Sequence, residues 1–417
     1  NGCVPLNIWS KGLSDEALAF ISYPAGAVAT RITTEQKVLM ATITGNTADW
    51  FEVSRDAGPI GAVLGFEKLS ISSSIQTPDV IEQQLYYGFG AGPNSLTAEI
   101  DTSSVFSEVL IPLVSGKPFI DFMELEVGLR LSKHSNTGWD KTYKLALSYY
   151  PIEEVQIRVS SNKAIRSPSI DELFQERYFT FGFGVPDPCT MEGYFFAGVF
   201  ADFETLGPEC LATGMPEANL FTNEPGINDW GNVTGSSGGN AEIGPETAKT
   251  ESFGVVWTPY FENDFSMSLD FYSVTIENYI NNAPVGPWEI LNLCYSSNIP
   301  NAPWEVPLGR EQFNADSPAC RSIHRLENGK IDFIHLGATN LGEHHLQGWD
   351  LNISYGFDFL SGYLDIKYFA TKIIKRTIKD ETFVLFNESC VGFFNGACLT
   401  ILDDPVPAYK HRFNVSW

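Results

Sequence analysis

Long apolar runs are absent from this sequence. No stretch approaches the roughly 20 consecutive apolar residues of a membrane-spanning helix, which excludes a helical membrane protein. Basic residues are also scarce, since 26 Lys and Arg stand against 51 Asp and Glu, for a formal net charge of −25. Nucleic acid is therefore not an expected partner, because its phosphates require a Lys and Arg footprint. A β-barrel is still allowed, because its alternating strands give no hydropathy signal.

Cysteines with metal-site spacing are missing as well. The sequence contains no Cys-x-x-Cys, so a zinc ribbon or thioredoxin-type motif is not expected. Buried free thiols would be expected on strands among apolar positions, but the cysteines fall in pairs within loop-like stretches. We therefore expect three loop disulfides and an oxidising compartment. The expected pairs are Cys189 with Cys210, Cys294 with Cys320, and Cys390 with Cys398, which leaves Cys3 unassigned.

Apolar and polar residues alternate in many segments. In residues 123–131, for example, Met123, Leu125 and Val127 share one face, while Glu124 and Glu126 share the other. A period of two predicts half-buried β-strands. About eleven strands are expected, near residues 36–55, 60–75, 96–114, 119–133, 140–150, 153–166, 247–258, 264–279, 331–357, 361–376 and 408–417.

The connections between these segments alternate between tight turns and long excursions. The long ones span about residues 175–245, 281–330 and 379–408. An antiparallel meander gives this pattern when one rim is plain and the other elaborated, as in outer-membrane barrels. The strand alternation alone fits a soluble β-sandwich or propeller equally well. The barrel is favoured by the asymmetry of the connections, by the terminal Trp417, and by aromatic residues at expected strand ends: Tyr149, Tyr150, Trp257, Tyr260, Tyr272 and Tyr279.

Five segments resemble TonB-dependent outer-membrane receptors, in the order that this family shows. Residues 163–174, "KAIRSPSIDELF", closely resemble the family's Arg-Ala-Pro-Ser-x-x-Glu-Leu-Phe motif, where a barrel strand leaves the membrane toward the longest extracellular loops. The other four are the strand with Pro245 and Glu246, residues 269–280, residues 320–355 with Asn340, Gly348 and Asp350, and the C-terminal strand at 409–417.

The resemblance implies an all-β fold, a transmembrane antiparallel meander β-barrel of which this chain is the C-terminal half. Family barrels have about 22 strands, of which about 11 are expected here. Residues 36–417 would form the half barrel, and residues 1–35 an extracellular loop segment with a short helix near 14–22. The signal peptide, the TonB-contacting segment and the plug domain are expected to lie outside this chain.

The resemblance also implies location and partners. The location would be the bacterial cell outer membrane. The partners would be outer-membrane lipid, a TonB-type inner-membrane energy-coupling protein, the barrel-assembly machinery and a small-molecule or oligosaccharide substrate. The last strand would be the signal that the assembly machinery reads, with Phe413, Val415 and Trp417 facing outward, away from the lumen.

No catalytic arrangement stands out. His344 and His345 adjoin Glu343, but adjacent residues of a strand face opposite sides, so no metal site is expected there. Residues 235–240, "GSSGGN", lack the strand–helix context of a phosphate loop and are expected to form a flexible loop tip. We therefore expect neither an enzyme nor a cofactor.

The long loops offer a binding surface instead. Aromatic faces suit stacking on sugar rings or flat organic chelates, although the same side chains could anchor the loops' own small cores. Arg166, at a strand exit, could project into the lumen or form a salt bridge with Asp171 or Glu172. The candidate substrate contacts are Arg166, Tyr178, Phe179, Trp230, Trp288, Trp304 and Phe393.

The leading hypothesis is a fragment of an outer-membrane receptor that takes up a scarce nutrient through a plugged barrel by TonB-dependent transport. The nutrient would be a siderophore, an oligosaccharide or a similarly large solute. The alternatives are a passive porin or adhesive barrel without a plug, and a soluble secreted β-rich binding protein.

Overall fold

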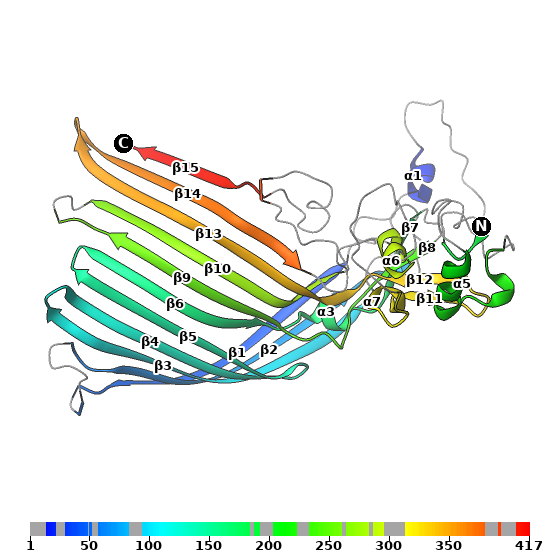
Figure 1. Cartoon of the computed structure of the whole chain (residues 1–417), viewed down its shortest axis with the longest axis horizontal. Helices are drawn as coiled ribbons and strands as arrows, with labels where there is room; N and C mark the ends of the chain where they lie inside the picture. Colours follow the sequence, from blue (N-terminus) through cyan, green and yellow to red (C-terminus); the bar gives the residue numbers. More distant parts are fainter. Residues whose placement is uncertain are drawn as a thin grey trace.

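One antiparallel sheet of eleven strands makes up most of the described chain (Figure 1). Its strand order is β1-β2-β3-β4-β5-β6-β9-β10-β13-β14-β15, so neighbours in the sheet follow the order of the chain. This confirms the predicted meander and its strand number. The computed structural model describes residues 14–21, 30–48, 50–51, 57–82, 94–183, 187–191, 203–222, 233–260, 264–282, 287–295, 313–379, 391–392 and 406–417.

The strands of this sheet run antiparallel, and several are longer than a membrane crossing requires. They are β1 (Arg31–Asn46), β2 (Gly61–Gln76), β3 (Leu96–Lys117), β4 (Ile120–His134), β5 (Gly138–Ile152), β6 (Val155–Arg166), β9 (Glu246–Trp257), β10 (Phe265–Asn282), β13 (Ala338–Phe359), β14 (Gly362–Lys379) and β15 (Tyr409–Ser416).

A second, four-stranded sheet lies at one rim, in the order β11-β12-β8-β7. We call this sheet and the helices beside it the loop subdomain. Its elements are β7 (Tyr178–Phe183), α5 (Phe203–Ala212), η1 (Glu217–Asn219), β8 (Val233–Ser237), α6 (Pro287–Tyr295), α7 (Pro318–Arg321), β11 (Ile323–Arg325) and β12 (Ile331–His335). The remaining helices are α1 (Asp15–Ile21), which confirms the short helix expected near 14–22, α2 (Asp79–Glu82) and α3 (Ile170–Phe174).

Two strand boundaries differ from those predicted. β1 covers 31–46 rather than 36–55, because the backbone N–H groups of Trp50 and Phe51 donate to the Thr47 carbonyl and form a turn there. The boundary expected between residues 35 and 36 therefore falls inside β1. The segment 331–357 forms two strands rather than one, because the N–H of Leu336 donates to the Ser236 carbonyl at 2.7 Å, in the small sheet.

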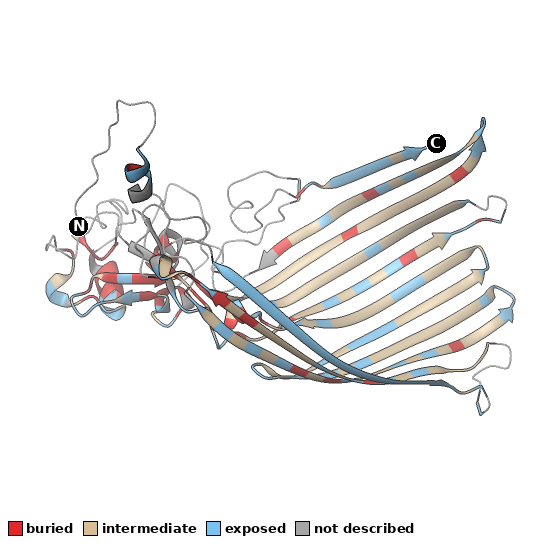
Figure 2. Cartoon of the chain, turned by 180° about the vertical axis from the view of Figure 1, so that it is seen from behind, coloured by how far each residue is buried: buried red, intermediate tan, exposed pale blue. Residues whose placement is uncertain are grey.

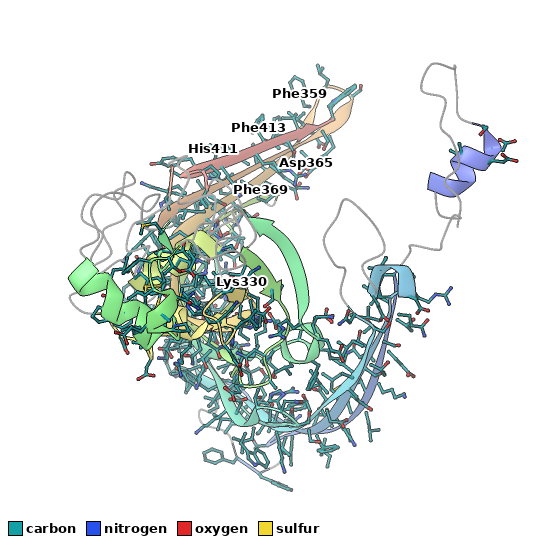
Figure 3. The ribbon with its side chains drawn as sticks, turned by 90° about the vertical axis from the view of Figure 1, so that its right-hand side faces the viewer. Lys330, Phe359, Asp365, Phe369, His411 and Phe413 are labelled. Atoms are coloured by element: carbon teal, nitrogen blue, oxygen red, sulfur yellow. A yellow bond between two sulfur atoms is a disulfide. The ribbon has the colours of Figure 1, made fainter. Side chains whose placement is uncertain are left out.

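The register defines two faces of the large sheet. Directly paired residues share a face, so Phe413 lies with Tyr368, while Arg412 lies with Phe369 on the other. Figure 3 shows Phe413 on the convex side of the curved sheet and Phe369 on the concave side. Val415 alternates with Arg412 and is convex too. Phe413 and Val415 therefore face outward, as predicted.

The two faces differ in chemistry. Convex side chains such as Leu131, Leu145 and Phe253 are 49%, 47% and 46% exposed. On the concave face, Ser104 and Ser132 are buried and hydrogen-bonded at 2.9 Å. A β-sandwich would bury its apolar faces against each other, whereas a membrane barrel turns them outward to lipid.

Deeply buried apolar residues concentrate in the loop subdomain instead (Figure 2). Fourteen buried residues form one cluster there, which includes Tyr295, Ile334, Ile290 and both disulfides. The loop subdomain therefore has a hydrophobic core of its own. Among the described residues, no helix is long and apolar enough to span a membrane.

Candidate functional site

The segment 163–174 forms the exit of β6 and the one-turn helix α3. Ser169 is the N-cap, and its side chain accepts a hydrogen bond from the Glu172 N–H at 3.2 Å. The Glu172 carboxylate in turn accepts one from the Ser169 N–H at 2.7 Å, which completes a capping box. The acidic turn after Pro168 is thus fixed by its own sequence.

Arg166 joins this turn to the strand that returns from the long loop. Its guanidinium donates to both oxygens of Glu246 at 2.8 and 2.9 Å and to both oxygens of Glu172 at 2.9 and 3.1 Å. The Glu246 carboxylate also accepts a hydrogen bond from the Ile280 N–H at 2.7 Å. Arg166 is therefore engaged in structural ion pairs, which supports the salt-bridge alternative, with Glu172 rather than Asp171.

The Glu172 carboxyl titrates below its ordinary range. Burial acts to raise its pKa, but the hydrogen bonds from Arg166 and from the Ser169 backbone outweigh burial, and the pKa is lowered. Glu172 is consequently ionised at neutral pH, and the ion pair with Arg166 is intact there.

The glycine-rich segment 235–240 is not a loop tip, contrary to the prediction. Its first residues belong to β8, and Gly239 donates its N–H to the Gln175 carbonyl at 2.8 Å. A Cβ on Gly239 would lie 2.7 Å from the backbone of Leu173. The glycines are needed because two backbones approach closely here, which a flexible tip would not require.

Three residues of the segment 320–355 that resembled the family also have structural roles. Asn340 bonds the Gly244 N–H at 2.8 Å and the Gly244 carbonyl at 3.0 Å, so it fastens the returning loop. A Cβ on Gly348 would meet the Tyr272 ring hydroxyl at 2.5 Å. Asp350 accepts a hydrogen bond from Thr371 at 2.6 Å. Asn340 therefore acts near the start of β13, whereas Gly348 and Asp350 lie farther along this strand, between β10 and β14.

The loop subdomain is held by two disulfides. Cys189 pairs with Cys210 and Cys294 with Cys320, at sequence separations of 21 and 26 residues. Both predicted pairings are confirmed. All four cysteines are buried in the same cluster, so the disulfides are part of its core.

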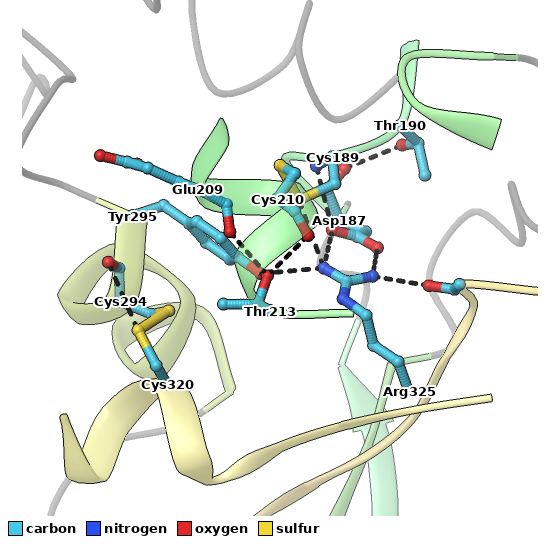
Figure 4. The surroundings of a disulfide bond; sticks show 11 residues. Asp187, Cys189, Thr190, Glu209, Cys210, Thr213, Cys294, Tyr295, Cys320 and Arg325 are labelled. Atoms are coloured by element: carbon cyan, nitrogen blue, oxygen red, sulfur yellow. Dashed lines mark hydrogen bonds and ion pairs between the residues drawn. A yellow bond between two sulfur atoms is a disulfide. The ribbon is translucent and has the colours of Figure 1, made fainter. Parts of the chain in front are cut away.

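A buried ion pair connects the two loops that carry these disulfides (Figure 4). Arg325 and Asp187 are 138 residues apart in sequence and bond through both carboxylate oxygens, one of them at 2.9 Å. Their side chains are only 2% and 8% exposed. The Arg325 guanidinium also donates to the Tyr295 hydroxyl at 3.0 Å, which bonds Thr213 at 2.6 Å.

The surroundings of Tyr295 and Arg325 determine the protonation states of both side chains. Burial raises the pKa of Tyr295, so its hydroxyl stays protonated. Burial alone would lower the pKa of Arg325, but the charge of Asp187 raises it, so the guanidinium stays charged. Sequence reasoning missed this pair, because no local pattern relates Asp187 to Arg325.

A stack of a cation and two rings lies on the small sheet. The Arg177 guanidinium carbon lies 3.9 Å from the centroid of the Phe333 ring, and the His324 ring stacks on Phe333 at 4.2 Å. Burial and the charge of Arg177 lower the pKa of His324. Burial, His324 and Arg177 lower the pKa of His335. Both imidazoles are therefore neutral at neutral pH.

The concave face below the loop subdomain carries ion pairs between strands. Arg158 on β6 donates to both oxygens of Asp270 on β10 at 2.9 and 2.7 Å, across the intervening β9. Gly254 on β9 leaves the space, because a Cβ there would lie 2.0 Å from Asp270. A wall of fixed, hydrogen-bonded charges suits a polar lumen.

The remaining candidate residues are only partly covered by the structure. Tyr178 and Phe179 lie on β7 and Trp288 on α6, but their side chains are outside the described part. Trp230, Trp304, Phe393 and the cysteines 3, 390 and 398 lie outside the described residues. His344 and His345 contact Arg376 and Ser273 respectively, from opposite faces of β13 as predicted. The described residues contain no cluster that could hold a metal ion.

Comparison with known proteins identifies the family. The sequence matches the family described as "TonB dependent receptor-like, beta-barrel" over residues 18–416. No curated protein matches it.

Solved receptors are distant. The siderophore receptor PirA from Pseudomonas aeruginosa is 12% identical, with 83% of this chain and 43% of that one covered and a TM-score of 0.45. The ferric enterobactin receptor PfeA from the same organism is 14% identical, with 82% and 36% covered and a TM-score of 0.49. The hemophore receptor HasR from Serratia marcescens is 12% identical, with 84% and 43% covered and a TM-score of 0.47. This chain spans less than half the length of these receptors. On the match over residues 18–416, the chain belongs to the TonB-dependent receptor family, whose members are outer-membrane transport receptors rather than enzymes, and forms part of its β-barrel.

Proposed function

We propose that this chain is part of an outer-membrane receptor that takes up a scarce nutrient through a plugged barrel, driven by a TonB-type inner-membrane protein. The observation that carries the proposal is the family's sheet with an apolar convex face and an ion-paired concave face. The loop subdomain at its rim would cover the entrance. A disulfide-braced surface with its own core suits tight binding, because little ordering is required when the ligand arrives.

The substrate would be a siderophore, an oligosaccharide or a similarly large solute. Because such solutes are scarce and large, the receptor would need several loop contacts that converge on one binding site. The aromatic candidates at Tyr178, Phe179, Trp230, Trp288, Trp304 and Phe393 would supply them. Arg166 is a weaker candidate, because its donors are engaged by two glutamates.

Uptake in the producing bacterium tests the proposal. Cells with and without the gene are supplied with labelled ferric siderophores or oligosaccharides, with or without a protonophore. We expect uptake of one class to require both the gene and the proton-motive force. Uptake that needs the gene but survives the protonophore would instead indicate a passive porin, and a protein released from the cells in soluble form would contradict membrane location.

A further inference from the structure

Five connections of the large sheet lie at the rim opposite the loop subdomain, which we call the turn rim (Figure 1). They join β1 to β2, β3 to β4, β5 to β6, β9 to β10, and β13 to β14. Gly, Pro, Asn, Asp and Ser are the usual residues of such turns. Each connection nevertheless exposes a large apolar residue, in chain order Trp50, Phe119, Ile152, Tyr260 and Leu360.

Phe119 and Leu360 are unusual in two respects. They are 82% and 85% exposed, and among the large apolar side chains of the described part only Trp50, at 91%, is more exposed. Their backbones are left-handed, with φ values of 61° and 56°. This conformation is unfavourable for a residue with a Cβ atom, and glycine or asparagine usually occupies it. Folding therefore does not explain why these two positions hold Phe and Leu, and strain of this kind is frequent at functional sites.

Hydrogen bonds fix the arrangement of the turn rim. The Tyr149 hydroxyl on β5 donates to the Phe119 carbonyl in the β3–β4 turn at 2.6 Å. The β5–β6 and β9–β10 turns are joined through Glu154, whose carbonyl accepts from the Thr258 N–H at 2.9 Å and whose carboxylate accepts from the Tyr260 N–H at 3.0 Å. A surface held in this way needs little ordering when a partner binds.

The turn rim is acidic as well as apolar. Nine Asp and Glu and only two Lys and Arg occur in the five connecting segments, residues 46–61, 115–122, 150–156, 256–266 and 356–363. The exposed carboxylates of the described part include Asp121, Glu153, Asp264 and Asp358. Carboxylates gathered at one rim give a negative potential that favours a partner with basic residues.

Lipid and a second copy of the chain fit this surface poorly. An aromatic boundary facing lipid already exists on the convex face, where Trp257 lies 5.4 Å from Phe265 and Phe265 lies 6.0 Å from Tyr355. Tyr260 and Leu360 lie beyond these rings, in the turns. Anionic head groups attract basic residues and would repel the carboxylates, and a second copy would bring two acidic rims together.

We propose that the turn rim is the docking surface for a water-soluble periplasmic protein other than the energy-coupling protein. Its contact surface combines Lys and Arg side chains, which face the carboxylates, with apolar pockets that receive Phe119 and Leu360. The family resemblance places contact with the energy-coupling protein on a segment outside this chain, whereas this surface belongs to the sheet itself. The proposal rests on the proposed function, because it requires that the turn rim face the periplasm.

Photocrosslinking in the producing bacterium is the first test. The photoreactive residue p-benzoylphenylalanine replaces Phe119 or Leu360 in the full-length receptor, and it replaces Leu145 on the apolar convex face as a control. We expect positions 119 and 360 to crosslink to the same protein, identified by mass spectrometry, and position 145 to crosslink to none. A protonophore should leave these crosslinks unchanged, because docking does not require energy coupling.

Binding of the identified partner, purified, to the purified full-length receptor is the second test. The variant F119G/L360G removes both side chains and relieves the left-handed backbone, so it should be at least as stable as wild type. Because it loses two apolar anchors, it should bind the partner roughly 10- to 30-fold more weakly. Added salt should weaken binding by wild type, because it screens the carboxylates.

The matched control is Leu326→Ser, which changes an exposed apolar residue of the β11–β12 turn and should bind the partner like wild type. Faster migration of unheated protein on electrophoresis shows that each variant is folded. Asparagine also tolerates a left-handed backbone. F119N/L360N therefore serves as a second variant, with the same expected loss of binding.

Several results would overturn the proposal: crosslinks from positions 119 and 360 only to lipid, to a second copy of the receptor or to the energy-coupling protein, no protein crosslink, or unchanged binding by folded F119G/L360G. If these occur in a receptor that fractionates with outer membranes, the proposed function stands. If wild type does not fractionate there, the proposed function fails irrespective of the crosslinks.

Discussion

In this chain, charged residues that lie far apart in the sequence form ion pairs that stabilise the fold. Arg166 lies in a motif that the sequence reveals, and Glu246 in another, but their pairing follows only once β6 and β9 are neighbours. Arg325 and Asp187 lie in no motif at all. The position of Arg166 at a strand exit was therefore predictable from the sequence. The buried Arg325 network was not, because long-range contacts depend on the whole fold.

Replacing Arg325 by Met should destabilise the loop subdomain strongly. The change leaves the Asp187 carboxylate buried without its partner, and breaking a buried pair costs about 3–5 kcal/mol. Hydrogen exchange of the amides in β11 and β12 measures the loss. Tyr295→Phe is the matched control, since it removes one neutral hydrogen-bonding group and should cost only about 1 kcal/mol. Equal exchange in R325M and wild type would show that the pair contributes nothing.

Elements with one clear period were predictable, and elements that change period or partner were not. The alternation in residues 123–131 identified β4, and its hairpin partner followed from the short turn. The single strand expected over residues 331–357 is interrupted at Leu336, whose backbone N–H donates to a different sheet. The prediction for residues 235–240 was wrong because glycine occurs where two backbones approach closely as well as in flexible loops. Composition cannot distinguish the two cases.

Removing the cap of α3 should loosen the strand exit. Ser169→Ala eliminates the side-chain oxygen that accepts the Glu172 N–H, and loss of an N-cap costs about 1 kcal/mol. Faster hydrogen exchange in α3, with the strands unchanged, is the expected result. Ser169→Asp keeps an acceptor at the cap and should exchange like wild type, so a similar effect of both substitutions would argue against the capping role.

The small sheet should weaken in mild acid. The pKa values of His324 and His335 are lowered below the ordinary value of 6.5, so the unfolded chain binds protons first as the pH falls. Stability is therefore complete above pH 6.5 and is lost progressively below it. Hydrogen exchange in β12, corrected for the intrinsic pH effect, should rise between pH 7 and pH 5. His335→Gln should reduce this response, and an unchanged response would exclude His335 as its source.

The whole molecule combines two parts that place their apolar residues in opposite ways. The large sheet places polar groups inside and apolar groups outside, as its alternation predicted. The loop subdomain follows the opposite rule and buries its apolar residues. The cysteine spacing indicated that the loops are braced, but their shared core could not be read from the sequence, because it combines short segments without a regular period.

Opening both disulfides should unfold the loop subdomain and spare the sheet. Loops of 21 and 26 residues correspond to a stabilisation of roughly 3 kcal/mol each. Serine replacements at Cys189, Cys210, Cys294 and Cys320 should therefore increase exchange in α5 and α6, while β4 and β5 in the same molecule serve as the internal control. Loss of protection in both regions together would contradict independent stability of the two parts.

The contact between Arg325 and Asp187 has an evolutionary consequence. Two loops that lie far apart in the sequence are joined by this ion pair and share one hydrophobic core. A receptor that changes its specificity by remodelling one excursion must then accommodate the other. Among related genes, substitutions and length changes around residues 187–222 are expected to be inherited together with those around 313–335.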